Sequence, residues 1–442
     1  MKVTIINHSD TAGGASIVSF RLMEAMRKEG VDARMLVMHK SYDSPYVEQA
    51  ASGLRTKIPF IREHVEILCN NGFSRADLFK VSTARYGLPL ANHPLVKDAD
   101  AVIINWINQG MLSLDEIGKI ADEKPTLWTM HDMWNMTGIC HHAAQCPRYR
   151  QSCGNCPLLN RAASPNDLSH RVFRSKQELY GGHKIDFVAV SNWLGERAAE
   201  STLLKDQKVH VIHNAFPVDL YSQPSTLTRH QLGLPTKGKI IVFCAARIDD
   251  PIKGLPLAVS ALNNLAESHG KEATVVFVGN LRDSDALRDL RFPYVALGPV
   301  NSRSRMRAIM AHANVVLSTS SFESLPTVLI EGQAAGATPV GYVHDGRADI
   351  ITDGATGYAI RPSDYYINHD CDGSTCKNNE LSACRVVSTA DAIRKALDSP
   401  IPKEQLREAA RRFSYETISG RYLDLIDELI DERNGLPGPE NN

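Results

Sequence analysis

Residues 239–265 read KIIVFCAARIDDPIKGLPLAVSALNNL, and this stretch sets the expected fold. The β-branched run 239–245 predicts a strand, and the apolar spacing over 255–265 predicts a helix. The polar loop between them carries Arg247 and Lys253. A strand that leads through a loop into a helix is the repeating unit of parallel α/β sheets.

The same unit recurs along the whole chain. Residues 15–29, 303–312 and 327–335 are further expected helices, and a Gly13-Gly14 turn precedes the first of them. The further expected strands are 3–6, 33–38, 101–104, 126–130, 187–190, 209–212, 273–278 and 315–318. This alternation in both halves predicts an α/β fold with two doubly wound, Rossmann-like domains.

The domain limits follow from breaks in this pattern. We expect an N-terminal domain at 1–216, a linker at 217–237, a C-terminal domain at 238–412 and a C-terminal helix within 413–442. The linker is expected because prolines, serines and threonines interrupt the periodicity there. Residues 362–388 are expected to be a polar insertion.

The composition is that of a globular protein. Of 442 residues, 43% are hydrophobic and 22% are charged, and the formal net charge is -1, which argues against nucleic acid as the main partner. The apolar run 3–6 is too short for a signal peptide. No stretch approaches the roughly 18 apolar residues that span a bilayer. We therefore expect a cytoplasmic protein.

Residues 320–331 read SSFESLPTVLIE and carry the clearest candidate site. We expect Ser324 to cap a helix, because Pro326 suits the first helical turn. The amides of Thr327 and Val328 would then be open to a phosphate group. Glu323 and Glu331 lie eight residues apart, so their carboxylates can accept hydrogen bonds from sugar hydroxyls. The alternative is a capping Glu323 and a solvated Glu331.

Arg247 and Lys253 form the second candidate pair. They follow the carboxyl end of a strand, which is where open α/β sheets bind ligands. Arginine offers a fork of donors to a phosphate and lysine a compact charge, so together they suit a diphosphate. The alternative is that both pair with Asp249 and Asp250 at the surface.

A cysteine cluster is the third candidate. Cys140, Cys146, Cys153 and Cys156 follow the spacing C-x5-C-x6-C-x2-C. Four thiolates so close in sequence predict a structural zinc, with an iron–sulfur cluster or unliganded thiols as alternatives. A looser set, Cys371, Cys376 and Cys384, is interpreted as part of the polar insertion rather than as a zinc site.

Several of these features together resemble a known family. They are the E-x7-E pair, the Arg247 to Gly254 loop, the Gly13-Gly14 turn, AAGATPV at 334–340 and DGATG at 353–357. In this order they resemble the large family of retaining glycosyltransferases with two Rossmann-like domains, the GT-B fold. WINQGMLSL at 106–114 and WTMHDMW at 128–134 are similar to members that build bacterial exopolysaccharides of the colanic-acid type.

The resemblance implies a role for each residue of the donor site. Glu331 would bind the nucleotide ribose and Glu323 the donor sugar. Arg247 and Lys253 would hold the diphosphate. Pro326 departs from the family's usual glycine-rich turn, and because proline has no N–H it removes one phosphate-binding amide.

The resemblance also implies how the first half contributes. The two domains would face each other across a cleft, and the C-terminal helix would cross back to the first domain. His131, at a strand end, would face the donor sugar near the reacting carbon. Gly13 and Gly14 would let the backbone approach the substrates.

The implied activity is transfer of a sugar from a nucleotide-diphosphate donor, with retention, to a glycan or lipid-linked acceptor. Such an acceptor would bring the protein to the inner membrane surface. An Asp-x-Asp site is missing from the donor loop, so we predict no catalytic divalent metal. The alternatives are an epimerase or phosphorylase of the same architecture, and a non-catalytic metal-containing scaffold.

Overall fold

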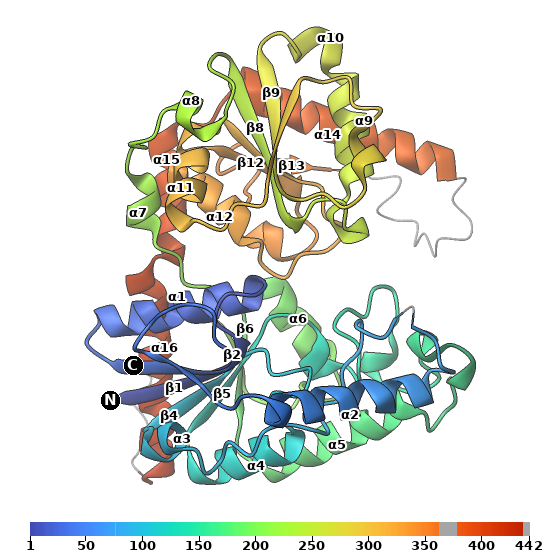
Figure 1. The fold of residues 1–442 in the computed structure, drawn as a ribbon, viewed down its shortest axis with the longest axis vertical. Coiled ribbons are helices and arrows are strands. Elements are labelled where there is room, and N and C mark those ends of the chain that lie inside the picture. The colour runs from blue at the N-terminus through green and yellow to red at the C-terminus, as the bar shows by residue number, and fades with distance from the viewer. Residues whose placement is uncertain (76, 362–377, 436–442) are drawn as a thin grey trace. The chain divides into compact units, whose positions relative to one another are not determined.

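The computed structural model describes residues 1–75, 77–361 and 378–435. The chain divides into two compact units (Figure 1). The first is Met1–Ala215 together with Tyr415–Asn442, and the second is Phe216–Ser414. Within the described residues, no helix is both long and apolar enough to cross a membrane.

The described part of the first unit contains a seven-stranded parallel sheet in the order β3-β2-β1-β4-β5-β6-β7. Its strands are β1 (Lys2–Ser9), β2 (Asp32–His39), β3 (Val47–Gln49), β4 (Ala101–Ile104), β5 (Thr126–Met130), β6 (Asp186–Ala189) and β7 (Val209–Val211). Its helices are α1 (Gly14–Lys28), α2 (Leu54–Asn70), α3 (Pro94–Asp98), α4 (Leu114–Glu123), α5 (Leu168–Gly182), α6 (Asn192–Glu200) and α16 (Tyr415–Arg433).

The C-terminal helix α16 is part of the core of the first unit. It packs on α1, and its buried apolar residues join the cluster around β1 and β2. The Tyr415 hydroxyl donates to Glu24 at 2.9 Å, and the Tyr422 hydroxyl lies 3.0 Å from that of Thr129 on β5. The helix is thereby fixed to the sheet by apolar burial and by two polar contacts.

The described part of the second unit contains a six-stranded parallel sheet in the order β10-β9-β8-β11-β12-β13. Its strands are β8 (Lys239–Arg247), β9 (Ala273–Asn280), β10 (Tyr294–Gly298), β11 (Val315–Ser318), β12 (Thr338–Tyr342) and β13 (Tyr358–Ile360). Its helices are α7 (Val218–Ser222), α8 (Arg229–Leu232), α9 (Leu255–Asn264), α10 (Ala266–His269), α11 (Arg303–His312), α12 (Thr327–Ala335), α14 (Asn378–Asp398) and α15 (Lys403–Ala410).

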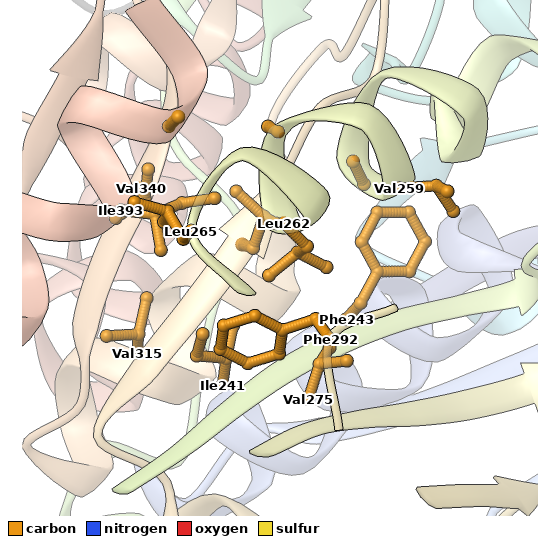
Figure 2. Packing of buried hydrophobic residues seen from close by; sticks show 14 of the residues in the cluster. Ile241, Phe243, Val259, Leu262, Leu265, Val275, Phe292, Val315, Val340 and Ile393 are labelled. Atoms are coloured by element: carbon orange, nitrogen blue, oxygen red, sulfur yellow. The ribbon is translucent and has the colours of Figure 1, made fainter. Parts of the chain in front are cut away.

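The core of the second unit lies between this sheet and the helices α9 and α14. Leu262 of α9 lies over Ile241 of β8 and Val275 of β9, and Ile393 of α14 lies beside Val340 of β12 (Figure 2). All five side chains are buried. The prediction of two parallel, doubly wound sheets is confirmed.

The segment 217–237 differs from the expected linker. It belongs to the second unit and contains α7 and α8. Val218, Tyr221 and Leu232 are buried, so this segment folds onto its unit although its prolines suggested a free connection. The described part of the polar insertion, from residue 378, continues as α14, and residues 362–377 lie outside the described residues.

Candidate functional site

The candidate site of the second unit lies where the direction of strand order reverses. The strands β8 and β11 are neighbours, and the connections that follow them lead to opposite sides, towards β9 and β12. Ligands of open α/β sheets bind at the carboxyl ends of the strands at such a point. Arg247 is the last residue of β8, the loop after β8 carries Lys253, and the loop after β11 carries Glu323.

Two of the predicted site residues meet directly. The Nζ atom of Lys253 lies 2.6 Å from Oε1 of Glu323, and both side chains are partly buried. Arg247 instead pairs with Asp250 at 3.0 Å and with Asp249 at 3.8 Å. Arg247 thus makes the local ion pairs with Asp249 and Asp250, whereas Lys253 reaches across to the other loop.

The two loops are joined by backbone hydrogen bonds. The Ser321 amide donates to the Ile252 carbonyl at 2.8 Å, and the Thr319 hydroxyl lies 3.0 Å from the carbonyls of Lys253 and Gly254. A Cβ atom on Gly254, whose φ is +69°, would lie 2.3 Å from the Thr319 carbonyl oxygen. Only glycine allows this approach, so the sequence fixes how closely the loops sit.

A buried ion pair that we did not predict supports the Glu323 loop. Arg347 donates to both carboxylate oxygens of Asp345, at 2.8 and 2.6 Å, and to the Ser320 carbonyl at 2.6 Å. The Glu323 amide donates to the same Asp345 at 2.8 Å. A carbon on Gly346 would lie 1.7 Å from the Ser324 carbonyl oxygen. The Asp-Gly-Arg sequence after β12 is a signal that could have pointed to this support.

The helix α12 begins at Thr327, and Pro326 is its N-cap residue without a side-chain hydrogen bond. The predicted Ser324 cap is therefore wrong, because the helix starts later than that cap requires. The amides of Thr327 and Val328 belong to the first helical turn, which has no carbonyl partner within the helix. They stay candidates for phosphate binding.

Glu331 lies within α12 and is 9% exposed, which does not fit the alternative of a solvated surface residue. Its charge and that of Lys253 both act on the thiol of Cys244 on β8, whose pKa is raised to about 12 mainly by burial. Glu331, Lys253 and Glu323 therefore belong to one region at the carboxyl end of β8.

His131 of the first unit follows β5. Its Nε2 atom lies 2.7 Å from Oδ1 of Asn105, after β4. Burial lowers the pKa of His131 to about 4, although the nearby Asp132 opposes the shift. The ring is neutral near pH 7 with the proton on Nε2, because Oδ1 can only accept. His131 and Asn105 line a small recess with His213 and Tyr422.

Gly13 and Gly14 stand at the start of α1. Gly13 is the N-cap residue with φ +88°, a conformation that favours glycine. A Cβ atom at either position would meet no atom within 4 Å. Both residues are exposed, so the backbone here is open to approach.

A further polar group in the first unit was missed by the sequence reasoning. Nδ1 of His141 lies 2.8 Å from Oδ2 of Asp132, and its Nε2 lies 3.1 Å from the Ser82 hydroxyl. The Trp106 indole also donates to Asp132, at 3.2 Å. Burial opposes ionisation of Asp132, but His141, His142 and the Trp134 amide together lower its pKa to about 2. The group fixes the loop that follows His131.

The structure does not support the predicted metal site at Cys140, Cys146, Cys153 and Cys156. Over the described parts of the chain, no group of three or more His, Cys, Asp or Glu side chains could hold a metal ion. Cys140 and Cys156 instead join a small apolar cluster. Burial raises the pKa of Cys140 to about 12 and that of Cys153 to about 11, and other cysteines of the set add to each shift. Of the looser set, Cys371 and Cys376 lie outside the described residues.

Comparisons with known proteins show what the chain resembles. Residues 225–368 match the family described as "Glycosyl transferases group 1". Over 66 residues the chain is 32% identical to an Escherichia coli (strain K12) protein provisionally named a colanic acid biosynthesis glycosyl transferase. That match covers 14% of this chain and 16% of the relative, so the chain aligns with about a sixth of the relative's length.

Solved structures resemble the whole chain. One is WaaG, a glycosyltransferase involved in lipopolysaccharide biosynthesis, with a TM-score of 0.60, 15% identity, and 96% of this chain and 99% of that chain covered. Another is Anabaena HepE in complex with UDP and glucose, with a TM-score of 0.60, 15% identity, and 97% of this chain and 99% of that chain covered. A third is sucrose-phosphate synthase from Thermosynechococcus elongatus, with a TM-score of 0.63, 16% identity, and 98% of this chain and 99% of that chain covered. Residues 225–368 therefore match the group 1 glycosyl transferases, in a chain that has the GT-B fold.

Proposed function

We propose that the chain is a retaining glycosyltransferase that moves a sugar from a nucleotide-diphosphate donor to a hydroxyl of a glycan or lipid-linked acceptor in polysaccharide biosynthesis. The group 1 domain supports the class of enzyme. The name of the E. coli relative supports the type of pathway. The Anabaena neighbour binds UDP and UDP-glucose, which supports a nucleotide sugar as donor.

One observation carries the proposal: Lys253 and Glu323 meet at 2.6 Å at the carboxyl ends of β8 and β11. A cation next to a hydrogen-bond acceptor matches the two chemically different parts of a nucleotide sugar. The diphosphate takes the charge of Lys253, and the sugar hydroxyls donate to the Glu323 carboxylate. Both residues lie within the matched range 225–368.

The other candidate residues of the second unit complete the donor site. Arg247 adds a second cation for the diphosphate, and the amides of Thr327 and Val328 add donors at a helix N-terminus. Glu331 accepts hydrogen bonds from the ribose. Because negative charge grows on the leaving diphosphate in the transition state, fixed cations and amides directed there lower the barrier. We propose no catalytic divalent metal.

In the first unit, we propose that His131, Gly13 and Gly14 contact the substrates. The low pKa of His131 makes it a neutral hydrogen-bonding group at pH 7 rather than a cation. Its Nδ1 lone pair can then accept from a hydroxyl, since the proton is held on Nε2 by Asn105. We propose that the protein works in the cytoplasm at the membrane surface, where a lipid-linked acceptor would be presented.

The test starts with donor binding, measured by calorimetry with UDP, UDP-glucose and other nucleotide sugars. Bound donors are then incubated with lipid-linked acceptors, and the products are identified by mass spectrometry and their anomeric configuration by NMR. We expect acceptor-dependent transfer with retention. Turnover without an acceptor would identify an epimerase, a requirement for phosphate would identify a phosphorylase, and failure to bind any nucleotide would indicate a scaffold.

A further inference from the structure

The helix α2 in the first unit turns a polar side towards the core. Its fully buried residues are Thr56, Glu63 and Ile67. Glu63 accepts hydrogen bonds from the amides of Thr83 at 2.6 Å and Ala84 at 3.0 Å. This arrangement reverses the usual one, because a surface helix normally buries its apolar residues and exposes its polar ones.

The opposite side of α2 exposes a continuous row of large apolar residues, which we call the apolar stripe. Its members are Leu54, Ile58, Ile61 and Val65, and they are 72%, 50%, 54% and 52% exposed. Their spacing of four, three and four residues keeps them on one face of a helix. Contiguous exposed apolar surface of this kind marks an interaction site, whereas scattered exposed residues do not.

Two exposed phenylalanines extend the apolar surface beyond α2. Phe79 is 63% exposed and its ring lies 4.9 Å from that of His64 on α2. Phe73, two residues after the C-cap of α2, is 72% exposed. Aromatic side chains of this kind suit the boundary between lipid head groups and acyl chains.

Basic side chains border the apolar stripe on both sides. Arg55, Lys57 and Arg62 are exposed. At 100° per residue, Arg55 and Arg62 fall on one side of the stripe and Lys57 falls on the other. Long basic side chains beside an apolar row can place their stems along acyl chains and their charges among phosphates.

A cavity of about 250 Å³ opens beside this helix, and Ile58 and Arg62 form part of its wall. Arg62 lies over the ring of Tyr86 at 4.5 Å. The wall also includes Arg85 and Lys119. Asp115 and Glu116 line the same recess, and Lys119 pairs with Glu116 while Arg85 pairs with Glu66. The recess therefore carries both signs of charge, and it is the basic border of the stripe itself that suits a phosphate-bearing head group.

We propose that α2 docks the first unit on a lipid bilayer that carries anionic head groups. The apolar stripe with Phe73 and Phe79 enters the boundary of the acyl chains, and Arg55, Lys57 and Arg62 contact lipid phosphates. A second copy of this chain is the competing occupant. We favour lipid because the basic border of the stripe would repel the same border on a second copy.

The test measures binding of the full chain to vesicles by co-sedimentation, with neutral phosphatidylcholine vesicles compared with vesicles that contain phosphatidylglycerol. We expect binding to the anionic vesicles, a decrease of at least tenfold in Val65→Glu and Ile58→Glu, and weaker binding at high salt because screening acts on the basic border. The matched control is Val387→Glu, since Val387 is also a helical valine that is 52% exposed.

Three results would overturn the proposal. They are no binding to anionic vesicles, equal binding of the wild type and the α2 variants, and a dimer in light scattering that Ile58→Glu converts to a monomer. The vesicle assay contains no sugar donor or acceptor. A lack of vesicle binding is therefore distinguishable from a lack of the proposed transferase activity. Circular dichroism and UDP binding of the variants verify that they are folded.

Discussion

Lys253 donates to Glu323 at 2.6 Å although the two residues lie 70 positions apart in the sequence. The pair is held in place from both directions. The Lys253 loop is bonded through its carbonyls to Thr319, and the Glu323 amide is bonded to the buried Asp345. The short distance between Lys253 and Glu323 therefore depends on the strand order of the second unit, which makes β8 and β11 neighbours.

The first prediction concerns this pair. Lys253→Ala should lower turnover by about 10²–10³-fold, the usual effect of removing one group that stabilises developing charge, and should weaken UDP binding. Glu323→Ala should lower turnover while UDP binding is largely kept, because the carboxylate is assigned to the sugar. Steady-state kinetics and calorimetry measure both effects. Lys271→Ala, at an exposed lysine before β9, is the control. Full activity in both site variants would reject the assignment.

The second prediction concerns the ion pair that supports the Glu323 loop. The side chains of Arg347 and Asp345 are 0% and 1% exposed. Arg347→Met leaves a buried carboxylate without its main partner, so the free energy of unfolding of the second unit should fall by about 3–5 kcal/mol. Urea denaturation measures this. The double variant Arg347→Met with Asp345→Asn should be more stable than Arg347→Met alone, and the opposite order would contradict the explanation.

The third prediction compares two glycine-to-alanine changes. In Gly346→Ala the new carbon would lie 1.7 Å from the Ser324 carbonyl oxygen, so the Glu323 loop must shift. We expect a loss of stability of about 1–3 kcal/mol, as for other overpacked sites, and lower turnover. A Cβ atom added to Gly420 on α16 would meet no atom within 4 Å. Gly420→Ala should therefore be neutral or stabilising by up to about 1 kcal/mol. Equal effects would contradict this prediction.

Local patterns were enough to predict much of the fold. The bounds of α11, β11 and α12 agree with the expected ones. Local signals mark them: Ser302 caps α11, β11 is a short buried run, and Gly336 ends α12 as a left-handed C-cap. The helix α2 was not predicted, since Pro59 interrupts it and its apolar residues face outward. The strand β12 contains Pro339 although it lies between β11 and β13, and proline normally indicates an edge strand.

The site was only partly predictable. Candidate residues next to strand ends could be selected from the sequence, because parallel strands bring their carboxyl ends together. The support of Glu323 by Asp345 and Arg347 was missed although the Asp-Gly-Arg sequence is visible, since those contacts span more than 20 residues and depend on which strands are neighbours. The cysteine spacing predicted a metal site that the described residues do not support, and Cys140 and Cys156 pack with a small apolar cluster.

The fourth prediction tests the role of the cysteines. If Cys140 is a buried apolar group, Cys140→Ser should lower the stability of the first unit by about 1–3 kcal/mol, since a hydroxyl replaces a thiol in apolar surroundings. Cys146→Ser should have less effect, because Cys146 does not join this cluster. A chelator should leave the melting temperature unchanged. If the four cysteines shared a metal, both variants and the chelator would be similarly destabilising.

The fifth prediction concerns stability in acid. Burial lowers the pKa of both His8 and His131 to about 4 in the folded protein, whereas unfolded histidine titrates near 6.5. Between pH 6.5 and pH 4 the unfolded chain therefore binds more protons, so the free energy of unfolding should fall as the pH falls through this window. The loss should total a few kcal/mol for the two residues, since one pKa unit corresponds to about 1.4 kcal/mol.

Urea titrations of the first unit's transition at pH 7.5, 6, 5 and 4.5 would measure this loss. His8→Gln should flatten the dependence, because the variant has no group to protonate there, while His230→Gln, at an exposed histidine, should leave it unchanged. Asp132, with its pKa near 2, stays ionised throughout and loses its stabilising contribution only at lower pH. A steep fall in stability that persists in His8→Gln and in His131→Gln would show that other groups control the acid response.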